Sequence, residues 1–238
     1  MKSRIFKVFR LFSFNAKLME KENISQTILS IDTSSTNCTV VLSQSDSIIY
    51  QISSSLPNKH DKFLAEFTRR ILSDTEKNFN DLDAIAITSG PGSFTGLRIG
   101  FSFVKGLVVD SDAKLILLPT LQLYALQSLE LAKLSGKNKI LSAIKGNSGK
   151  CYKQHFDLNH NQIDAIEIID IDDLQLDENT FFSGDFEIPG NPHKFNSINY
   201  ILPTTLSNLA NSKFINQDFT DFDNFEPSYY QEFNFKKV

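Results

Sequence analysis

Residues 83–100 read DAIAITSGPGSFTGLRIG, and this stretch decides which fold the chain is expected to adopt. Apolar and small residues over 83–88 predict a buried β-strand. Apolar residues return at helical spacing over about 94–109, so a glycine-rich loop joins a strand to a helix. Because the first N–H groups of a helix lack partners within it, such a loop is a ready anion site at the carboxyl edge of a sheet.

The candidate phosphate ligands of this loop are two glycines, two hydroxyl side chains and one arginine: Gly90, Gly92, Ser93, Thr95 and Arg98. The glycines allow unusual backbone dihedral angles close to a ligand, and either hydroxyl can cap the helix. A structural ion pair is the alternative role for Arg98. No Gly-Lys-Ser or Gly-Lys-Thr follows, so the loop is not a Walker A motif.

The flanking sequence predicts a regular order of elements, with strands over 27–32, 38–42, 48–52 and 115–118 and helices over about 59–72 and 119–136. The short separations between the first three strands predict an antiparallel meander. A meander followed by alternating helices and strands gives a mixed α/β sheet with packed helices. The RNase H-like fold of the actin-like ATPase superfamily has this order, and it is the predicted fold, in two subdomains.

The end of the first predicted strand holds a second group of candidate phosphate ligands, Asp32, Thr33 and Ser34. Actin-like ATPases hold phosphate and its metal at this position, where a carboxylate binds Mg²⁺ through water. Thr33 stands where such enzymes usually have a glycine, and its branched side chain crowds the approach of a phosphate. The alternative is that Asp32 and its hydroxyl neighbours build a self-bonded turn.

The second half has weaker signals, with a strand pair over 140–144 and 151–156 and a helix over about 203–214. No Lys or Arg occurs between Gln154 and His193, which predicts an acidic, solvated face that repels RNA. We therefore expect a leader over 1–26, an RNase H-like subdomain over 27–120, and a smaller acidic subdomain over 121–238 whose end packs back on the first.

Composition restricts the function. The 238 residues carry a net charge of −4, which argues against a chain that grips nucleic acid alone through a basic face. Two cysteines are too few for a disulfide framework, and no apolar run is long enough to span a bilayer, so a cytoplasmic protein is expected.

No pair of histidines has the helical spacing that chelates a metal, so no metal site is predicted. The sequence also has no Gly-Gly turn to hold adenosine, so no required cofactor is predicted. Ser183-Gly184-Asp185 is the one candidate remnant of an adenosine turn.

Residues 1–18 contain five basic residues and no acidic residue. A targeting segment would have this composition. Alternatively, Met19 is the true start and the stretch is not part of the protein.

Several of these residues together resemble the TsaB (YeaZ) family. The similar segments are Ile28–Ser35, Cys38–Leu42, His60, Gly90–Gly100 and, more weakly, Leu141–Phe156 and Glu226–Tyr229. The resemblance implies a non-catalytic subunit that pairs with and activates a TsaD-like transferase, which puts threonylcarbamoyl on the adenosine beside the anticodon of tRNA. It also implies a TsaE-like ATPase as a further partner and contact with tRNA only through the complex.

In that family the two helices of the first subdomain form much of the partner interface, which implies the contact residues Phe63, Phe67, Arg70, Gly96, Gly100 and Phe103. Gly96 and Gly100 lie four residues apart on one helical face, where another backbone can pack close. Lys145-Gly146-Asn147 departs from the Asp-Ala-Arg of relatives. The alternatives are a stand-alone ATP- or phosphate-dependent transferase, residual nucleotide binding at the glycine loop, and a homodimer through the same helices when the partner is absent.

Overall fold

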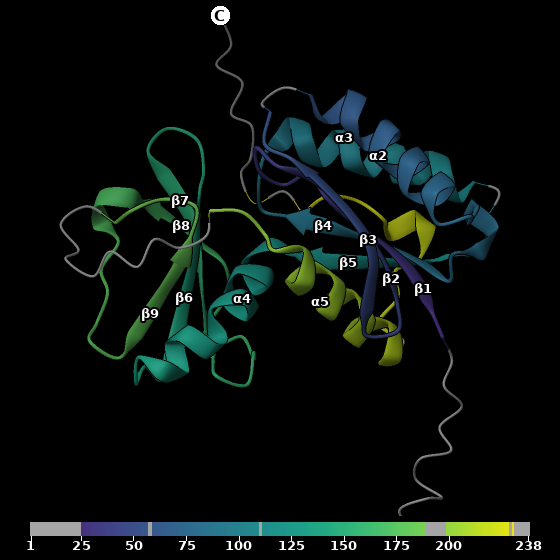
Figure 1. Ribbon diagram of the computed structural model, residues 1–238. Helices are drawn as coiled ribbons and strands as arrows, with labels where there is room; N and C mark the ends of the chain where they lie inside the picture. The colour runs from purple at the N-terminus through teal and green to yellow at the C-terminus, as the bar shows by residue number, and fades with distance from the viewer. Residues whose placement is uncertain (1–24, 57–58, 110, 189–198, 229, 231–238) are drawn as a thin grey trace, which may run out of the picture.

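The computed structural model describes residues 25–56, 59–109, 111–188, 199–228 and 230 (Figure 1). Residues 1–24 of the predicted leader (1–26) and the loop at 57–58 lie outside these residues. Gln26, which the prediction also placed in the leader, is buried. Within the described part of the chain, no helix is long and apolar enough to cross a membrane.

The first sheet has five strands in the order β3-β2-β1-β4-β5. Its members are β1 (Thr27–Asp32), β2 (Cys38–Gln44), β3 (Ser47–Ser54), β4 (Ala84–Gly90) and β5 (Lys114–Pro119). β1 to β3 form an antiparallel meander, whereas β4 and β5 run parallel to β1. The predicted meander and the predicted mixed sheet are both confirmed, and this order is that of the RNase H-like fold.

Helices cover both faces of this sheet (Figure 1). α2 (His60–Asp74) and α3 (Phe94–Val108) pack on one face, over a core that includes Leu29, Ile85 and Val104. α4 (Thr120–Leu134) and α5 (Pro203–Ile215) pack on the other face. Both pairs of helices bury apolar side chains, which the helical spacing predicted.

The second sheet has four strands in the order β8-β7-β6-β9. They are β6 (Lys139–Lys145), β7 (Lys150–Asp157), β8 (Glu167–Asp170) and β9 (Thr180–Gly184). α4 lies between the two sheets and shares one core with both, from Ile28 of β1 to Phe181 of β9. Leu121, Leu123 and Tyr124 of this helix are all buried, because α4 has neighbours on two sides.

The chain returns to the first sheet after the second. α5 contacts β1, β2 and β5, and residues 219–228, here called the C-terminal strap, follow it. Thr220 forms a bridge to Leu115 of β5, and the ring of Phe225 is fully buried with its centroid 4.6 Å from that of Phe101. The strap ends where the Ser228 N–H donates to the Ser89 carbonyl oxygen over 2.8 Å. The part of the chain from 121 onward is therefore divided between the two sheets.

Candidate functional site

The two predicted groups of phosphate ligands meet at the carboxyl end of β1 and β4. The N–H of Ser93 donates to the carbonyl oxygen of Ser34 over 2.7 Å, which joins the glycine loop directly to the turn after β1. Parallel pairing of β1 with β4 explains this, because the carboxyl ends of neighbouring parallel strands lie at one edge of the sheet.

Asp32 is fully buried and forms the self-bonded turn that was the alternative to a metal ligand. Its Oδ1 accepts hydrogen bonds from the Ser34 N–H at 2.9 Å, the Ser34 hydroxyl at 2.7 Å and the Thr88 hydroxyl at 2.9 Å. Its Oδ2 has no hydrogen-bond partner among the described residues. Burial raises the pKa of Asp32 above the usual range of a carboxyl, and the bonds from Ser34 and Thr88 only partly oppose this.

Four of the backbone donors around the glycine loop are used inside the chain. The N–H groups of Ser34 and Ser93 are bound as described, and the N–H of Gly96 donates to the Ser93 hydroxyl over 3.2 Å. The N–H of Leu97 donates to the Ser93 carbonyl oxygen over 2.8 Å. Ser93, and not Thr95, is therefore the N-cap of α3. A phosphate bound through these four N–H groups would have to break bonds that the fold already makes.

The glycines of α3 pack against the chain's own turn. A Cβ atom on Gly96 would lie 2.1 Å from the carbonyl oxygen of Thr33, and one on Gly100 would lie 2.5 Å from the Thr33 hydroxyl. Gly92 has the same relationship to Ser34, with a Cβ at 2.5 Å from its carbonyl oxygen. The predicted close approach is present, but it is internal. The prediction that Gly96 and Gly100 contact a partner is corrected, because both are buried by Thr33.

A cavity of about 650 Å³ opens beside this junction, between the two sheets. Three helix starts border it, with His60 and Asp61 from α2, Ser93 and Thr95 from α3, and Thr120 from α4. The second sheet contributes Lys145 and Asp185, whose carboxylate accepts the Lys145 N–H over 2.8 Å. Burial raises the pKa of Asp185. The charged lining is thus one lysine and two carboxylates, Asp61 and Asp185, which does not favour a polyanion.

Other predicted site residues lie outside this cavity. Asp32 and Thr33 are buried behind its wall, and Gly90 is enclosed by Leu97 and Ser228. Arg98 is exposed, and its guanidinium carbon lies 4.5 Å from the centre of the Phe94 ring. This is a cation–π contact, and Arg98 makes no ion pair within 4 Å among the described residues.

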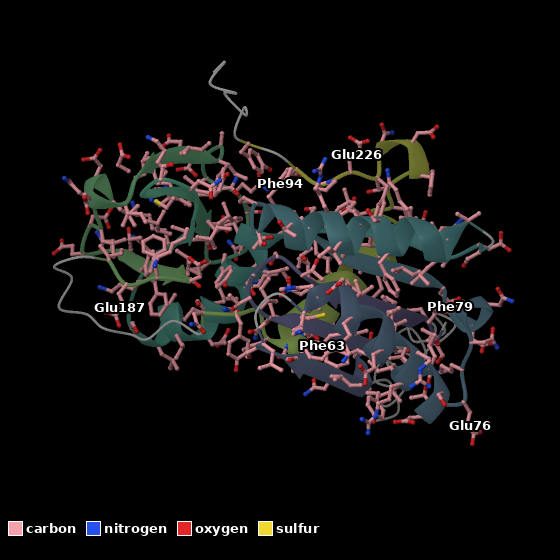
Figure 2. All side chains as sticks on the ribbon, turned by 90° about the horizontal axis from the view of Figure 1, so that it is seen from above. Phe63, Glu76, Phe79, Phe94, Glu187 and Glu226 are labelled. Carbon is pink, nitrogen blue, oxygen red and sulfur yellow. The ribbon has the colours of Figure 1, made fainter. Side chains whose placement is uncertain are left out.

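The aromatic candidates of α2 and α3 form part of one surface. Phe63 and Phe67 are half-buried and stacked, with ring centroids 5.2 Å apart and an interplanar angle of 4°. Phe103 of α3 is also half-buried against the same core. Arg70 is exposed and pairs with Asp74 over 3.4 Å. We call Phe63, Phe67 and Phe103 the α2–α3 surface; Figure 2 shows Phe63 at the outside of the molecule.

Sequence reasoning did not find the part of the cavity contributed by α4 and the second sheet. Tyr124 was expected in the core, but it also borders the cavity, and burial raises its pKa, with Asp185 and Asp32 adding to the effect. Lys145 was noted only as a departure from relatives. Among the described residues, no group of three or more His, Cys, Asp or Glu side chains could hold a metal ion.

Comparison with known proteins places the chain in a family. A family model described as "TsaD: tRNA N6-adenosine threonylcarbamoyltransferase" matches residues 53–177, just over half of the chain. The protein from Escherichia coli K12 called tRNA threonylcarbamoyladenosine biosynthesis protein TsaB is 29% identical over 136 residues, 57% of each chain. The protein of the same name from Buchnera aphidicola of Acyrthosiphon pisum is 27% identical over 140 residues, 59% of this chain and 62% of the relative. The chain belongs to the TsaB (YeaZ) family.

The fold agrees with this membership. The structure of YeaZ from Pseudomonas aeruginosa superposes with a TM-score of 0.73 at 21% identity, covering 86% of this chain and 99% of that one. The likeness confirms the RNase H-like (actin-like) fold for this TsaB-family chain. By sequence, however, it spans only about 60% of the length of the curated TsaB relatives named above.

Proposed function

We propose that this chain takes part in the biosynthesis of threonylcarbamoyladenosine in tRNA as a non-catalytic subunit that binds and activates a TsaD-like transferase. The names of its relatives and the matching family model support the pathway. The non-catalytic role rests on one observation: the N–H groups of Ser34 and Ser93 and the Oδ1 of Asp32, which an actin-like ATPase would offer to phosphate and metal, are already hydrogen-bonded within the chain.

The proposed binding surface for the transferase is the α2–α3 surface with Arg70 beside it. Half-buried aromatic side chains on two adjacent helices offer apolar area to a partner without further unfolding. We further propose that the chain requires no cofactor, that a TsaE-like ATPase joins the pair, and that tRNA is reached indirectly, through the complex.

The test is co-purification with a TsaD-like protein and reconstitution of tRNA modification. We expect the chain alone to be inactive and to raise the rate of the transferase when added. Phe67→Ala should weaken co-purification, while Phe214→Ala, a half-buried phenylalanine on the opposite face of the sheet, should not. Equal effects of the two variants would contradict the assigned surface.

The second candidate is a stand-alone ATP- or phosphate-dependent transferase, favoured only by the cavity beside the glycine loop. Steady ATP turnover by the purified chain, abolished by Asp32→Ala, would establish it and overturn the non-catalytic role. Light scattering with and without the transferase decides whether the α2–α3 surface pairs with a second copy when the partner is absent.

A further inference from the structure

A second cavity, of about 330 Å³, lies on the other side of the α3 start from the first. Three segments that are distant in sequence border it: the start of α3 at Ser93–Thr95, the β6–β7 turn at Lys145–Asn147, and the C-terminal segment at Ser228, the last residue of the strap, and Tyr230. Figure 2 shows Phe94 where the first sheet's helices meet the second sheet. The cavity exists because the strap returns to this junction.

Three aromatic side chains border this cavity. Phe94, Tyr152 and Tyr230 all border the cavity. Tyr152 and Tyr230 meet edge to face, with centroids 6.2 Å apart and an angle of 61°, and Tyr230 is 41% exposed. An exposed ring held in place by a second ring is a stacking platform that needs little ordering when a planar group binds.

The polar part of the wall suits an anion better than the first cavity does. No carboxylate is among the residues that border it, whereas Asp61 and Asp185 border the first. Lys145 is exposed and makes no ion pair within 4 Å in the described parts of the chain. The hydroxyls of Ser93, Thr95 and Ser228 add neutral hydrogen-bonding groups.

We propose that this second cavity binds one unstacked nucleotide of single-stranded RNA, with the base against Tyr230 and Tyr152 and the phosphate at Lys145. Proteins recognise single-stranded RNA by stacking bases on aromatic side chains and by pairing phosphates with cations, and both elements converge here. The volume is of the size that encloses a small ligand. The inference rests on the proposed role in tRNA modification and assigns this chain a direct RNA contact.

The rest of the surface limits this contact to one nucleotide. The net charge is −4, and the stretch from 157 to 188 contains many Asp and Glu residues but no Lys or Arg. Because these carboxylates repel phosphates, the chain alone should bind RNA weakly. In a complex, a partner would bind the rest of the RNA, and this cavity would position one base. The expected affinity of the isolated chain is therefore low and strongly dependent on salt.

The test measures fluorescence anisotropy of a short labelled single-stranded RNA with the full chain at low salt, with the matching RNA duplex as the second probe. Tyr230→Ala should weaken binding of the single strand at least fivefold, and Tyr230→Phe should restore it, because the phenyl ring still stacks. Lys145→Gln should lower the slope of log affinity against log salt by about 0.7. Lys133→Gln, the same charge change at an exposed residue paired with Glu130, should leave affinity within about twofold.

Three results would overturn the proposal. They are no detectable binding of the single strand at low salt, equal binding of the duplex, or equal losses in the Lys133 and Lys145 variants. Co-purification of the same variants with the TsaD-like protein separates the two proposals. If all variants co-purify but RNA binding is insensitive to Tyr230 and Lys145, only the cavity assignment fails. If the wild-type chain fails to co-purify, the proposed function fails whatever the RNA result.

Discussion

The N–H of Ser93 donates to the carbonyl oxygen of Ser34 across 2.7 Å, and this bond joins the glycine loop to the turn after β1. Gly92 and Gly96 allow the close approach, because a Cβ atom on either would meet the backbone of the turn after β1. The contacts between the loop and this turn are therefore part of the packing of the fold.

Asp32→Asn should leave the stability of the protein within about 1 kcal/mol of wild type or raise it at pH 7, because Asn keeps an acceptor for Ser34 and Thr88 and removes a buried charge. Asp32→Ala should cost about 2–4 kcal/mol, since buried donors lose their acceptor. Urea unfolding monitored by circular dichroism measures both.

The pH dependence of stability in wild type and Asp32→Asn tests the same carboxylate more directly. Burial raises the pKa of Asp32 in the folded state, so the folded protein retains a proton that the unfolded chain has lost. Wild-type stability should therefore fall, relative to Asp32→Asn, as the pH rises from the ordinary carboxyl pKa through the raised one. A difference between the two proteins that is constant with pH would show that Asp32 titrates normally.

Gly96→Ala should destabilise the protein by about 3 kcal/mol, because the added Cβ meets a backbone carbonyl that cannot move aside easily. Gly100→Ala should cost less, since the nearest atom belongs to the Thr33 side chain. Gly106→Ala on the same helix has open space around it and should gain about 0.5–1 kcal/mol from helix propensity. Melting temperatures that rise from Gly96→Ala to Gly100→Ala to Gly106→Ala would agree with internal packing of the first two glycines. A Gly96→Ala protein as stable as wild type would refute this packing.

Phe225→Ala should cost about 3–5 kcal/mol, because it removes a fully buried ring that anchors the strap against Phe101. Phe222→Ala is the matched control, since this ring is 48% exposed in the same segment and should cost less than about 1 kcal/mol. Limited proteolysis should cut the strap earlier only in the first variant. Similar cleavage of both would mean that Phe225 does not hold the strap.

Asp177 tests the surface electrostatics of the second sheet. The Lys139 ammonium, 2.7 Å away, and the Thr180 hydroxyl lower the pKa of Asp177 to about 2. A lowered carboxyl pKa contributes stability that is present above the ordinary value and is lost as pH falls through about 2. Asp177→Asn should therefore be less stable than wild type at pH 5 and indistinguishable from it near pH 2. Glu178→Gln, at the exposed neighbouring residue, should show no such convergence.

Local patterns predicted the elements well because strands and helices are encoded by short periods. Short apolar runs predict the strands of the meander, and apolar residues at helical spacing predict α3 and α4. The loop before α3 lies between a strand and a helix that were predicted in this way. The same patterns could not predict that Leu123 is buried, since this depends on a second sheet packing behind α4. Nor could they show which acceptor each loop N–H would find.

The sequence alone predicted the order of the elements in the first sheet, the strand-loop-helix junction at Gly90–Gly96 and the two residue groups that meet there, because these depend on neighbours a few positions apart. It did not predict β8 or β9. Only the tertiary structure decided that Ser34 and Ser93 satisfy each other, that Thr33 fills the space above Gly96, and that the strap encloses a second cavity. Those outcomes depend on hydrogen bonds and van der Waals contacts between segments distant along the chain, whose pairing is fixed by packing of the whole fold rather than by any local period.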